Sequence, residues 1–145
     1  MIVPDVNVLI YAYNSTWQHH ADLRAWWEDT LSGSRNVGLA WVAVLGFIRI
    51  MTHARLIENP LKPAEACWEV RRWLGNPQVQ ILIPGTEHAE ILFGFLEQLG
   101  AAGNLTTDAH LAALAIEYRA ELASTDTDFA RFPKLRWFNP LRARR

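Results

Sequence analysis

Hydrophobic and polar positions along this chain form two kinds of segment. Short runs rich in Val, Ile and Leu, such as those at 1–4 and 79–84, predict β-strands. Longer runs with apolar residues three or four positions apart predict helices. The segment HHADLRAWWEDTLS at 19–32 is of this second kind, because Leu23, Trp27 and Leu31 recur every four residues. Strands that alternate with helices favour an α/β fold with a mostly parallel central sheet sandwiched between helices.

Boundary residues define several of the expected helices. One helix is expected to begin near Asn7, and another to run from Pro63 in its first turn to a stop at Gly75. Thr86 is expected as the N-cap of a helix that stops at Gly100. Strands are also expected at 36–40, 121–125 and 135–139, and helices at 41–54 and 106–120.

Two of these segments are apolar almost throughout. The run at 41–54 predicts a helix that is covered on most sides, and the run at 79–84 predicts a strand that is buried on both faces. The helical tryptophans favour core or interface anchors over platforms for stacking RNA bases, because they lie far in sequence from the acidic residues discussed below; they are Trp26, Trp27, Trp68 and Trp73.

Length and composition favour one globular domain over 1–145, with a short basic tail at 142–145. The chain has 145 residues, half of them hydrophobic, and a net charge of -1. Its single Cys67 forms no internal disulfide, and we interpret this residue as packing. No leader pattern or apolar run near twenty residues stands out, so we expect a cytoplasmic protein without a membrane partner.

Aspartates follow two of the expected strands. Asp5 comes directly after the first strand, and Asp126 and Asp128 come directly after the strand at 121–125. Asp108 lies in the first turn of the helix before that strand. Ligands of parallel sheets gather at the carboxyl ends of the strands, so these four carboxylates are expected to converge on one edge of the sheet.

Each acid also has a local explanation. Asp5 could simply cap the first helix, Asp108 could stabilise its own helix through the helix dipole, and Asp126 with Asp128 could form an Asx turn. Asp5 is nevertheless the only charged side chain in the first 21 residues apart from His, and its place in such an apolar passage calls for a partner.

A divalent cation would relieve the repulsion between crowded carboxylates. Mg²⁺ and Mn²⁺ prefer hard oxygen ligands, and such ions polarise phosphodiesters and activate water. Ser124 has no His in its own segment to activate it, which favours hydrolysis by metal-activated water. No pair among His19, His20, His53, His88 and His110 has the spacing of a zinc motif, so zinc is not expected, and we interpret His88 as exposed.

The passages PDVNVLIYAYN at 4–14 and GNLTTDAHLAALAIEYRAELASTDTDFARF at 103–132 resemble the PIN-domain ribonucleases, specifically the VapC toxins of type II toxin-antitoxin systems. The resemblance covers nearly the whole chain. It implies a single PIN-like domain, Mg²⁺- or Mn²⁺-dependent cleavage of RNA, homodimerisation and inhibition by a VapB-like antitoxin.

The resemblance also assigns roles to individual residues. It makes Asp5 and Asp108 the primary metal ligands, Asp126 a further ligand and Asp128 a catalytic neighbour that supports it. It gives Asn7 and Thr125 supporting roles in orienting water or phosphate.

Position 46 departs from the family pattern. Gly46 stands where these toxins usually carry a Glu, which would remove one carboxylate from the site. Arg49, three residues later, either faces phosphate or extends from the surface.

Two alternatives to a ribonuclease stay open. The first, for which Gly46 is the discriminating feature, is a catalytically weak PIN-like module that binds RNA or protein. The second is a phosphotransfer receiver domain, which would need paired acids after the first strand, where PDVNV offers one.

Overall fold

Five parallel strands form one sheet in the computed structural model, which describes residues 1–142. The strand order is β3-β2-β1-β4-β5, so β1 lies in the centre. Ile2 of β1 pairs with Val37 on one side and Glu121 on the other. The strands are β1 (Ile2–Pro4), β2 (Val37–Ala40), β3 (Val79–Leu82), β4 (Glu121–Ala123) and β5 (Arg136–Phe138). The expected parallel sheet is confirmed.

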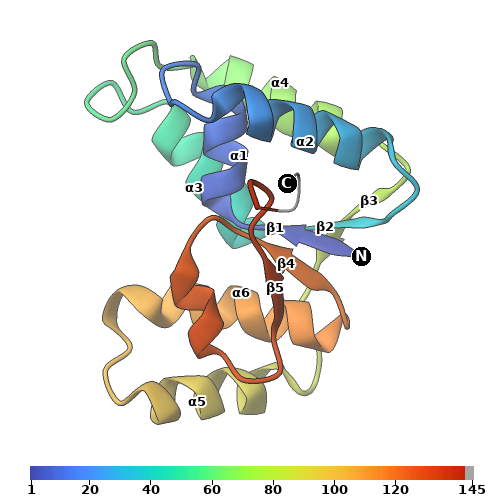
Figure 1. The fold of residues 1–145 in the computed structure, drawn as a ribbon, viewed down its shortest axis with the longest axis vertical. Coiled ribbons are helices and arrows are strands. Elements are labelled where there is room, and N and C mark those ends of the chain that lie inside the picture. Colours follow the sequence, from blue (N-terminus) through green and yellow to red (C-terminus); the bar gives the residue numbers. More distant parts are fainter. Residues whose placement is uncertain (143–145) are drawn as a thin grey trace.

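Helices cover both faces of this sheet (Figure 1). On one face lie α1 (Val6–Tyr13), α2 (His20–Ser32), α3 (Trp41–Met51) and α4 (Pro63–Leu74). On the other lie α5 (His88–Leu99) and α6 (Thr106–Glu117), with the 3₁₀ helices η1 (Gly103–Leu105) and η2 (Thr127–Arg131). The fold is therefore a three-layered α/β sandwich. The expected basic tail, apart from Arg142, lies outside the described residues.

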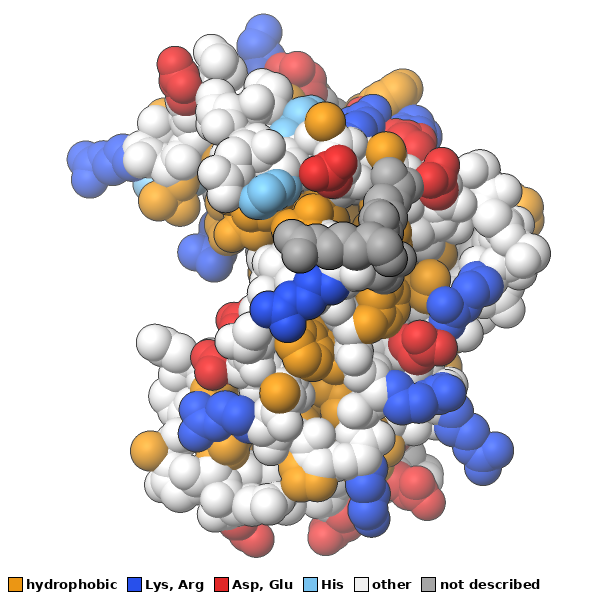
Figure 2. Space-filling model, viewed as in Figure 1, with side chains coloured by type: hydrophobic (Ala, Val, Ile, Leu, Met, Phe, Trp, Pro, Cys, Tyr) orange, Lys and Arg blue, Asp and Glu red, His pale blue; other side chains and the backbone are white. Residues whose placement is uncertain are grey.

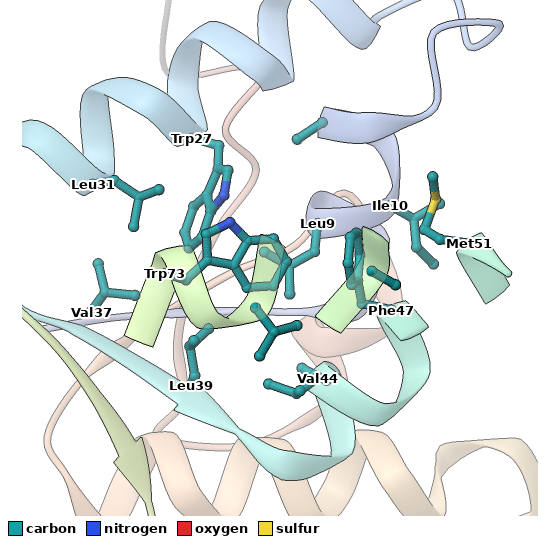
Figure 3. Packing of buried hydrophobic residues seen from close by; sticks show 14 of the residues in the cluster. Leu9, Ile10, Trp27, Leu31, Val37, Leu39, Val44, Phe47, Met51 and Trp73 are labelled. Atoms are coloured by element: carbon teal, nitrogen blue, oxygen red, sulfur yellow. The ribbon is translucent and has the colours of Figure 1, made fainter. Parts of the chain in front are cut away.

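The core on the α1–α4 side is built around aromatic side chains. Trp27 and Trp73 are fully buried and meet edge to face, with ring centroids 5.6 Å apart (Figure 3). Phe47 packs against Trp73, with ring centroids 4.8 Å apart. Burying a large aromatic ring contributes roughly 2–3 kcal/mol, so these rings hold α2, α3 and α4 together. The interpretation of Trp27 and Trp73 as core anchors is confirmed, whereas Trp68 is exposed.

The core on the other side depends on small residues of α6. Every residue of this helix from Ala109 to Ala115 is buried except His110. Such a run of alanines and leucines lets α6 lie between the sheet and α5 at close range. This packing fixes the first turn of α6, and with it Asp108, against the sheet.

Three sequence predictions were wrong in detail. β3 is an edge strand with only Leu82 fully buried, because among the described strands β2 alone pairs with it. In α3, Trp41 and Leu45 are 52% and 59% exposed, so this helix has an open face. The N-cap of α5 is Glu87, not Thr86, and its side chain makes no capping hydrogen bond. Among the described helices, none is long and apolar enough to cross a membrane.

Candidate active site

Asp5 lies where β1 ends and α1 begins. Its backbone N–H donates to the carbonyl of Ala123 in β4 at 2.9 Å, which joins the ends of the two central strands. As the N-cap of α1, its Oδ1 accepts from the backbone N–H of Val6 at 2.7 Å. Only 6% of Asp5 is exposed. The capping interpretation and the expected placement at the sheet edge are therefore both correct.

Ser124 connects the groups around Asp5. It is fully buried, and its hydroxyl donates to Asp5 Oδ2 at 2.7 Å. The hydroxyl oxygen of Ser124 in turn accepts from Asn7 Nδ2 and from the backbone N–H of Asp126, each at 3.0 Å. Sequence reasoning considered Ser124 only as a nucleophile and missed this role. A hydroxyl two residues before an Asp, the pattern of a Ser turn, was the signal that could have revealed it.

The segment after β4 brings two further aspartates to the same edge. Asp126 caps η2, because its Oδ1 accepts from the backbone N–H of Asp128 at 2.8 Å. The backbone N–H of Thr125 donates to Asn7 Oδ1 at 3.4 Å, a long contact that joins this segment to α1. The expected Asx turn is thus present, and the charge of Asp126 adds to the effect of burial in raising the pKa of Asp5.

Asp108 completes the group from the first turn of α6. Burial, and after it the charges of Asp5, Asp126 and Asp128, together raise the pKa of this carboxyl to about 6. Burial likewise raises the pKa of Asp5 to about 6, against the lowering effect of its hydrogen bonds from Ser124 and Val6. The four aspartates therefore act on one another electrostatically, as the strand-end argument predicted.

The donor set fits a hard divalent cation by its chemistry, because it consists of carboxylate oxygens that repel one another without a counter-charge. Within residues 1–142, however, no three His, Cys, Asp or Glu side chains lie close enough together to enclose a metal ion. Mg²⁺ commonly takes one or two carboxylates and completes its shell with water and phosphate oxygens. Figure 2 shows an open notch on the left of the view, with acidic side chains along its lower margin.

Other candidate residues lie elsewhere or differ from expectation. Arg49 is exposed on the last turn of α3 and forms no ion pair with any described residue. A side chain at Gly46 would point at Val6, since a Cβ atom there would lie 2.7 Å from Val6 Cγ2. His88 is buried, not exposed, because Glu117 and His110 both contact its ring. Its position before an amphipathic run gave no sign of these partners.

The raised pKa values predict how stability depends on pH in the absence of metal. In the unfolded chain an Asp ionises near its ordinary pKa of 3.8, whereas folded Asp5 and Asp108 hold their protons to about pH 6. The free energy of unfolding should therefore fall as pH rises from 4 to 6, by about 3 kcal/mol for Asp5 alone. Urea denaturation in EDTA measures this change.

The matched control for this pH dependence is the Asp5→Asn/Asp108→Asn double variant, in which the fall assigned to these two groups should vanish. Millimolar Mg²⁺ should also offset the fall at neutral pH, because an ion that binds only the folded chain stabilises it. Identical pH profiles for the two proteins would contradict the raised pKa values.

Comparison with known proteins agrees with this fold. The family description that matches residues 2–135 is PIN domain. Ribonuclease VapC33 of Mycobacterium tuberculosis is 49% identical over 142 residues, which cover 98% of this chain and 99% of that protein. Ribonuclease VapC37 of the same organism is 44% identical over 140 residues, or 97% of each protein.

Solved structures share the fold at lower identity. A VapBC2 complex from Rickettsia felis bound to a promoter DNA fragment matches with a TM-score of 0.69 and 18% identity, covering 96% of this chain and 98% of that one. VapBC-1 from nontypeable Haemophilus influenzae matches with a TM-score of 0.68 and 16% identity, covering 97% and 99%. The chain therefore belongs to the PIN-domain family and, within it, to the VapC group.

Proposed function

We propose that this chain is a Mg²⁺- or Mn²⁺-dependent endoribonuclease that acts as the toxin of a toxin-antitoxin pair. The observation that carries the proposal is the gathering of four aspartates from three separated segments, where burial and then the charges of Asp5, Asp126 and Asp128 raise the pKa of Asp108 to about 6. The relatives from M. tuberculosis at 49% and 44% identity are named ribonucleases, which supports RNA as the substrate class. A toxin that cleaves cellular RNA would act in the cytoplasm.

The residues divide the work at this site. Asp5, Asp108 and Asp126 would hold the cation, and Asp128 supports Asp126 through its backbone N–H. When bound, a divalent cation supplies Lewis acidity toward a phosphodiester and lowers the pKa of water. Ser124 holds Asp5 Oδ2 in place. Oxygens of Asp5 and Asp126 are thus fixed by hydrogen bonds before any substrate arrives.

Asn7 and Thr125 belong to the support of the site. Asn7 Nδ2 donates to Ser124 Oγ, and Asn7 Oδ1 accepts from the backbone N–H of Thr125. Because both ends of the Asn7 amide are engaged in this way, we assign it to holding α1 against the segment after β4. We therefore do not assign the orientation of water or phosphate to Asn7, because its amide nitrogen and its amide oxygen both already have hydrogen-bond partners.

Removal of divalent cations should abolish RNA cleavage. Purified, untagged protein is incubated with total RNA in EDTA, then with Mg²⁺ or Mn²⁺ added back in excess. We expect fragments only with the cations, because within residues 1–142 the one hydroxyl that is hydrogen-bonded to these carboxylates, that of Ser124, is fully buried and out of reach of RNA. An Asp108→Asn preparation purified in parallel reports contaminating nuclease. Undiminished cleavage in EDTA by the unmodified chain alone would contradict the proposal.

A catalytically weak PIN-like module that binds RNA or protein is the second candidate. The observation in its favour is Gly46, whose missing side chain leaves Val6 in the space beside the end of β1. The two candidates separate in one assay, since the weak module would retain RNA in a filter-binding experiment without cutting it at any cation concentration.

A VapB-like antitoxin is the partner that we propose for the face formed by α4 and the end of α1. This face carries a cavity of about 470 Å³, and Trp68 is 59% exposed at its rim. The cavity is lined by Tyr13, Leu61, Ala64, Glu65, Trp68 and Glu69. An exposed Trp beside a cavity is typical of an interface anchor, and the two glutamates favour a basic side chain in the docking segment.

Trp68→Ala should weaken binding of the antitoxin encoded by the neighbouring small gene by 10-fold or more, because buried Trp anchors commonly contribute more than about 1.4 kcal/mol. Isothermal titration calorimetry measures the affinity. Phe93→Ala is the matched control, since Phe93 is a similarly exposed aromatic on α5, on the far side of the sheet. Equal affinities of Trp68→Ala and Phe93→Ala for the antitoxin would mean that the antitoxin binds another face.

We also propose a homodimer. Trp41 and Leu45 lie one turn apart on α3 and are both exposed, which gives a second copy an apolar face to cover. Sedimentation equilibrium of the chain without antitoxin measures this state, and a monomer at micromolar concentration would exclude it.

A further inference from the structure

Three buried or half-buried side chains meet between α5 and α6, apart from the four aspartates. They are His88 in the first turn of α5 and His110 and Glu117 on α6. His110 follows Asp108 by two residues, which places them about 200° apart around the helix. The two side chains therefore leave opposite sides of α6, and His110 faces α5.

Glu117 orients His88. Its Oε2 lies 2.7 Å from His88 Nδ1, and its Oε1 accepts from the backbone N–H of Gly85 at 3.0 Å. A carboxylate beside Nδ1 accepts the Nδ1 proton of His88, and in the neutral ring this arrangement leaves the lone pair on Nε2. Only 7% of His88 is exposed, so packing also holds the ring. A carboxylate that fixes the tautomer of a histidine in this way is typical of metal-binding imidazoles.

The Nε2 lone pair of His88 points at a second imidazole. His88 Nε2 and His110 Nδ1 are 2.9 Å apart, and the two rings are nearly perpendicular at 76°. Two imidazole nitrogens on one tetrahedral Zn²⁺, each at about 2.0–2.1 Å, would be about 3.3 Å apart. For a metal ion to bind both nitrogens, they would move slightly apart and the His110 ring would turn so that the two lone pairs converge on the ion.

We propose that His88 Nε2 and His110 Nδ1 bind one transition-metal ion, with Zn²⁺ as the probe. Imidazole nitrogens favour Zn²⁺ over Mg²⁺, so this site would differ from the aspartates in the ion that it selects. No third His, Cys, Asp or Glu of residues 1–142 joins them, so water completes the coordination from the side where His110 is partly exposed. The site should therefore bind more weakly than structural zinc sites.

Proton balance is simple for two neutral rings. In the metal-free chain His110 Nδ1–H donates a hydrogen bond to His88 Nε2, and His88 Nδ1–H donates a hydrogen bond to Glu117. When the metal binds, the proton of His110 moves from Nδ1 to Nε2 through solvent, and both lone pairs then face the ion. No net proton is released, and Glu117 keeps its hydrogen bond to His88.

Calorimetric titration of the untagged chain with Zn²⁺, in millimolar Mg²⁺ to occupy the aspartates, tests the proposal. We expect the chain to bind one equivalent of Zn²⁺. The affinity for Zn²⁺ should be at least 10-fold weaker in His110→Gln and unchanged in Asp108→Asn. His53→Gln is the matched control, because His53 lies beyond the end of α3 and far in sequence from the pair. Glu117→Gln should weaken binding in the range of 10- to 100-fold, as loss of a group that orients a ligand does.

Absence of Zn²⁺ binding, or binding that His110→Gln leaves unchanged, would overturn the proposal and leave the contact as a hydrogen bond between helices. Loss of the Zn²⁺ equivalent in Asp108→Asn would assign the ion to the aspartates instead. If His110→Gln does not fold by circular dichroism, imidazole ¹⁵N shifts of the unmodified chain decide. Zn²⁺ should shift His88 Nε2 and His110 Nδ1, and shifts confined to other histidines would overturn the assignment.

Discussion

Asp108→Asn should lower the rate of RNA cleavage by roughly 100-fold or more at saturating Mg²⁺. The substitution removes one charge from a site whose proposed cation supplies several kcal/mol of stabilisation to the transition state, and each 1.4 kcal/mol is a factor of ten in rate. Single-turnover cleavage of a defined RNA measures the change. In cells, the same variant should no longer stop growth at equal expression.

Asp108 is a cleaner position for this experiment than Asp5. The carboxylate of Asp108 accepts no hydrogen bond within the described part of the chain, so the amide leaves no donor without a partner. Asp5 accepts from both Val6 and Ser124, and an Asn there would turn an amide N–H toward one of these donors. Asp5→Asn should also abolish cleavage, because it removes the charge of a proposed ligand. The misplaced amide should in addition lower the free energy of unfolding by about 1–3 kcal/mol.

The control for Asp108→Asn is Asp22→Asn, which changes another Asp in the first turn of a helix, remote in sequence from the site. Both variants lose a favourable charge near a helix N-terminus, worth about 0.3–1 kcal/mol. Only Asp108→Asn should lose cleavage, and it should gain stability in EDTA at neutral pH because a repelled charge is gone. An Asp108→Asn protein that keeps a third of the rate would remove Asp108 from the proposed ligands.

The layers of the fold were predictable because local signals agree with the tertiary structure. Pro63 and Gly75 mark the ends of α4, and Gly100 ends α5 with a φ of 70°, a conformation that favours glycine. Each of these signals lies within one turn of the element that it defines. The convergence of the aspartates was predictable for a related reason, since parallel strands expose all of their carboxyl ends at one edge.

Features that depend on neighbours far away in sequence were not predictable. The exposure of β3 follows from its place at the edge of the sheet, which its apolar residues do not encode. His88 is buried by Glu117 and His110, which lie 29 and 22 residues away. Ser124 contacts Asp5 across 119 residues. His88 and Ser124 are residues of ordinary type, and only the fold brings their partners to them.

Local and functional explanations of the acids turned out to be compatible. Asp5 caps α1 through Oδ1 and meets Ser124 through Oδ2, and Asp126 caps η2 while its charge raises the pKa of Asp5 and Asp108. A capping carboxylate is held in one orientation by backbone N–H groups. Such fixed oxygens are what a binding site for a hard cation requires, so the cap contributes to the site.

Gly46→Glu alone should destabilise the protein and should not improve cation binding. A Cβ atom at Gly46 would lie 2.7 Å from Val6 Cγ2 and 3.4 Å from Val6 Cβ, so the new side chain meets a short, branched neighbour that cannot bend away. Overpacking of this kind costs about 1–3 kcal/mol, which exceeds the roughly 1 kcal/mol gained by replacing a helical Gly. Thermal unfolding in EDTA measures the loss.

Removal of the Val6 methyl groups should reverse this outcome. In Val6→Ala/Gly46→Glu the carboxylate can occupy the vacated space beside Asp5, and a further oxygen ligand should tighten Mn²⁺ binding by roughly 10-fold relative to Val6→Ala. Val6→Ala/Gly46→Gln is the matched control, since it has the same shape without the charge. If calorimetry gives the Glu and Gln proteins the same Mn²⁺ affinity, position 46 does not reach the aspartates, and Gly46 does not mark the loss of a ligand from this site.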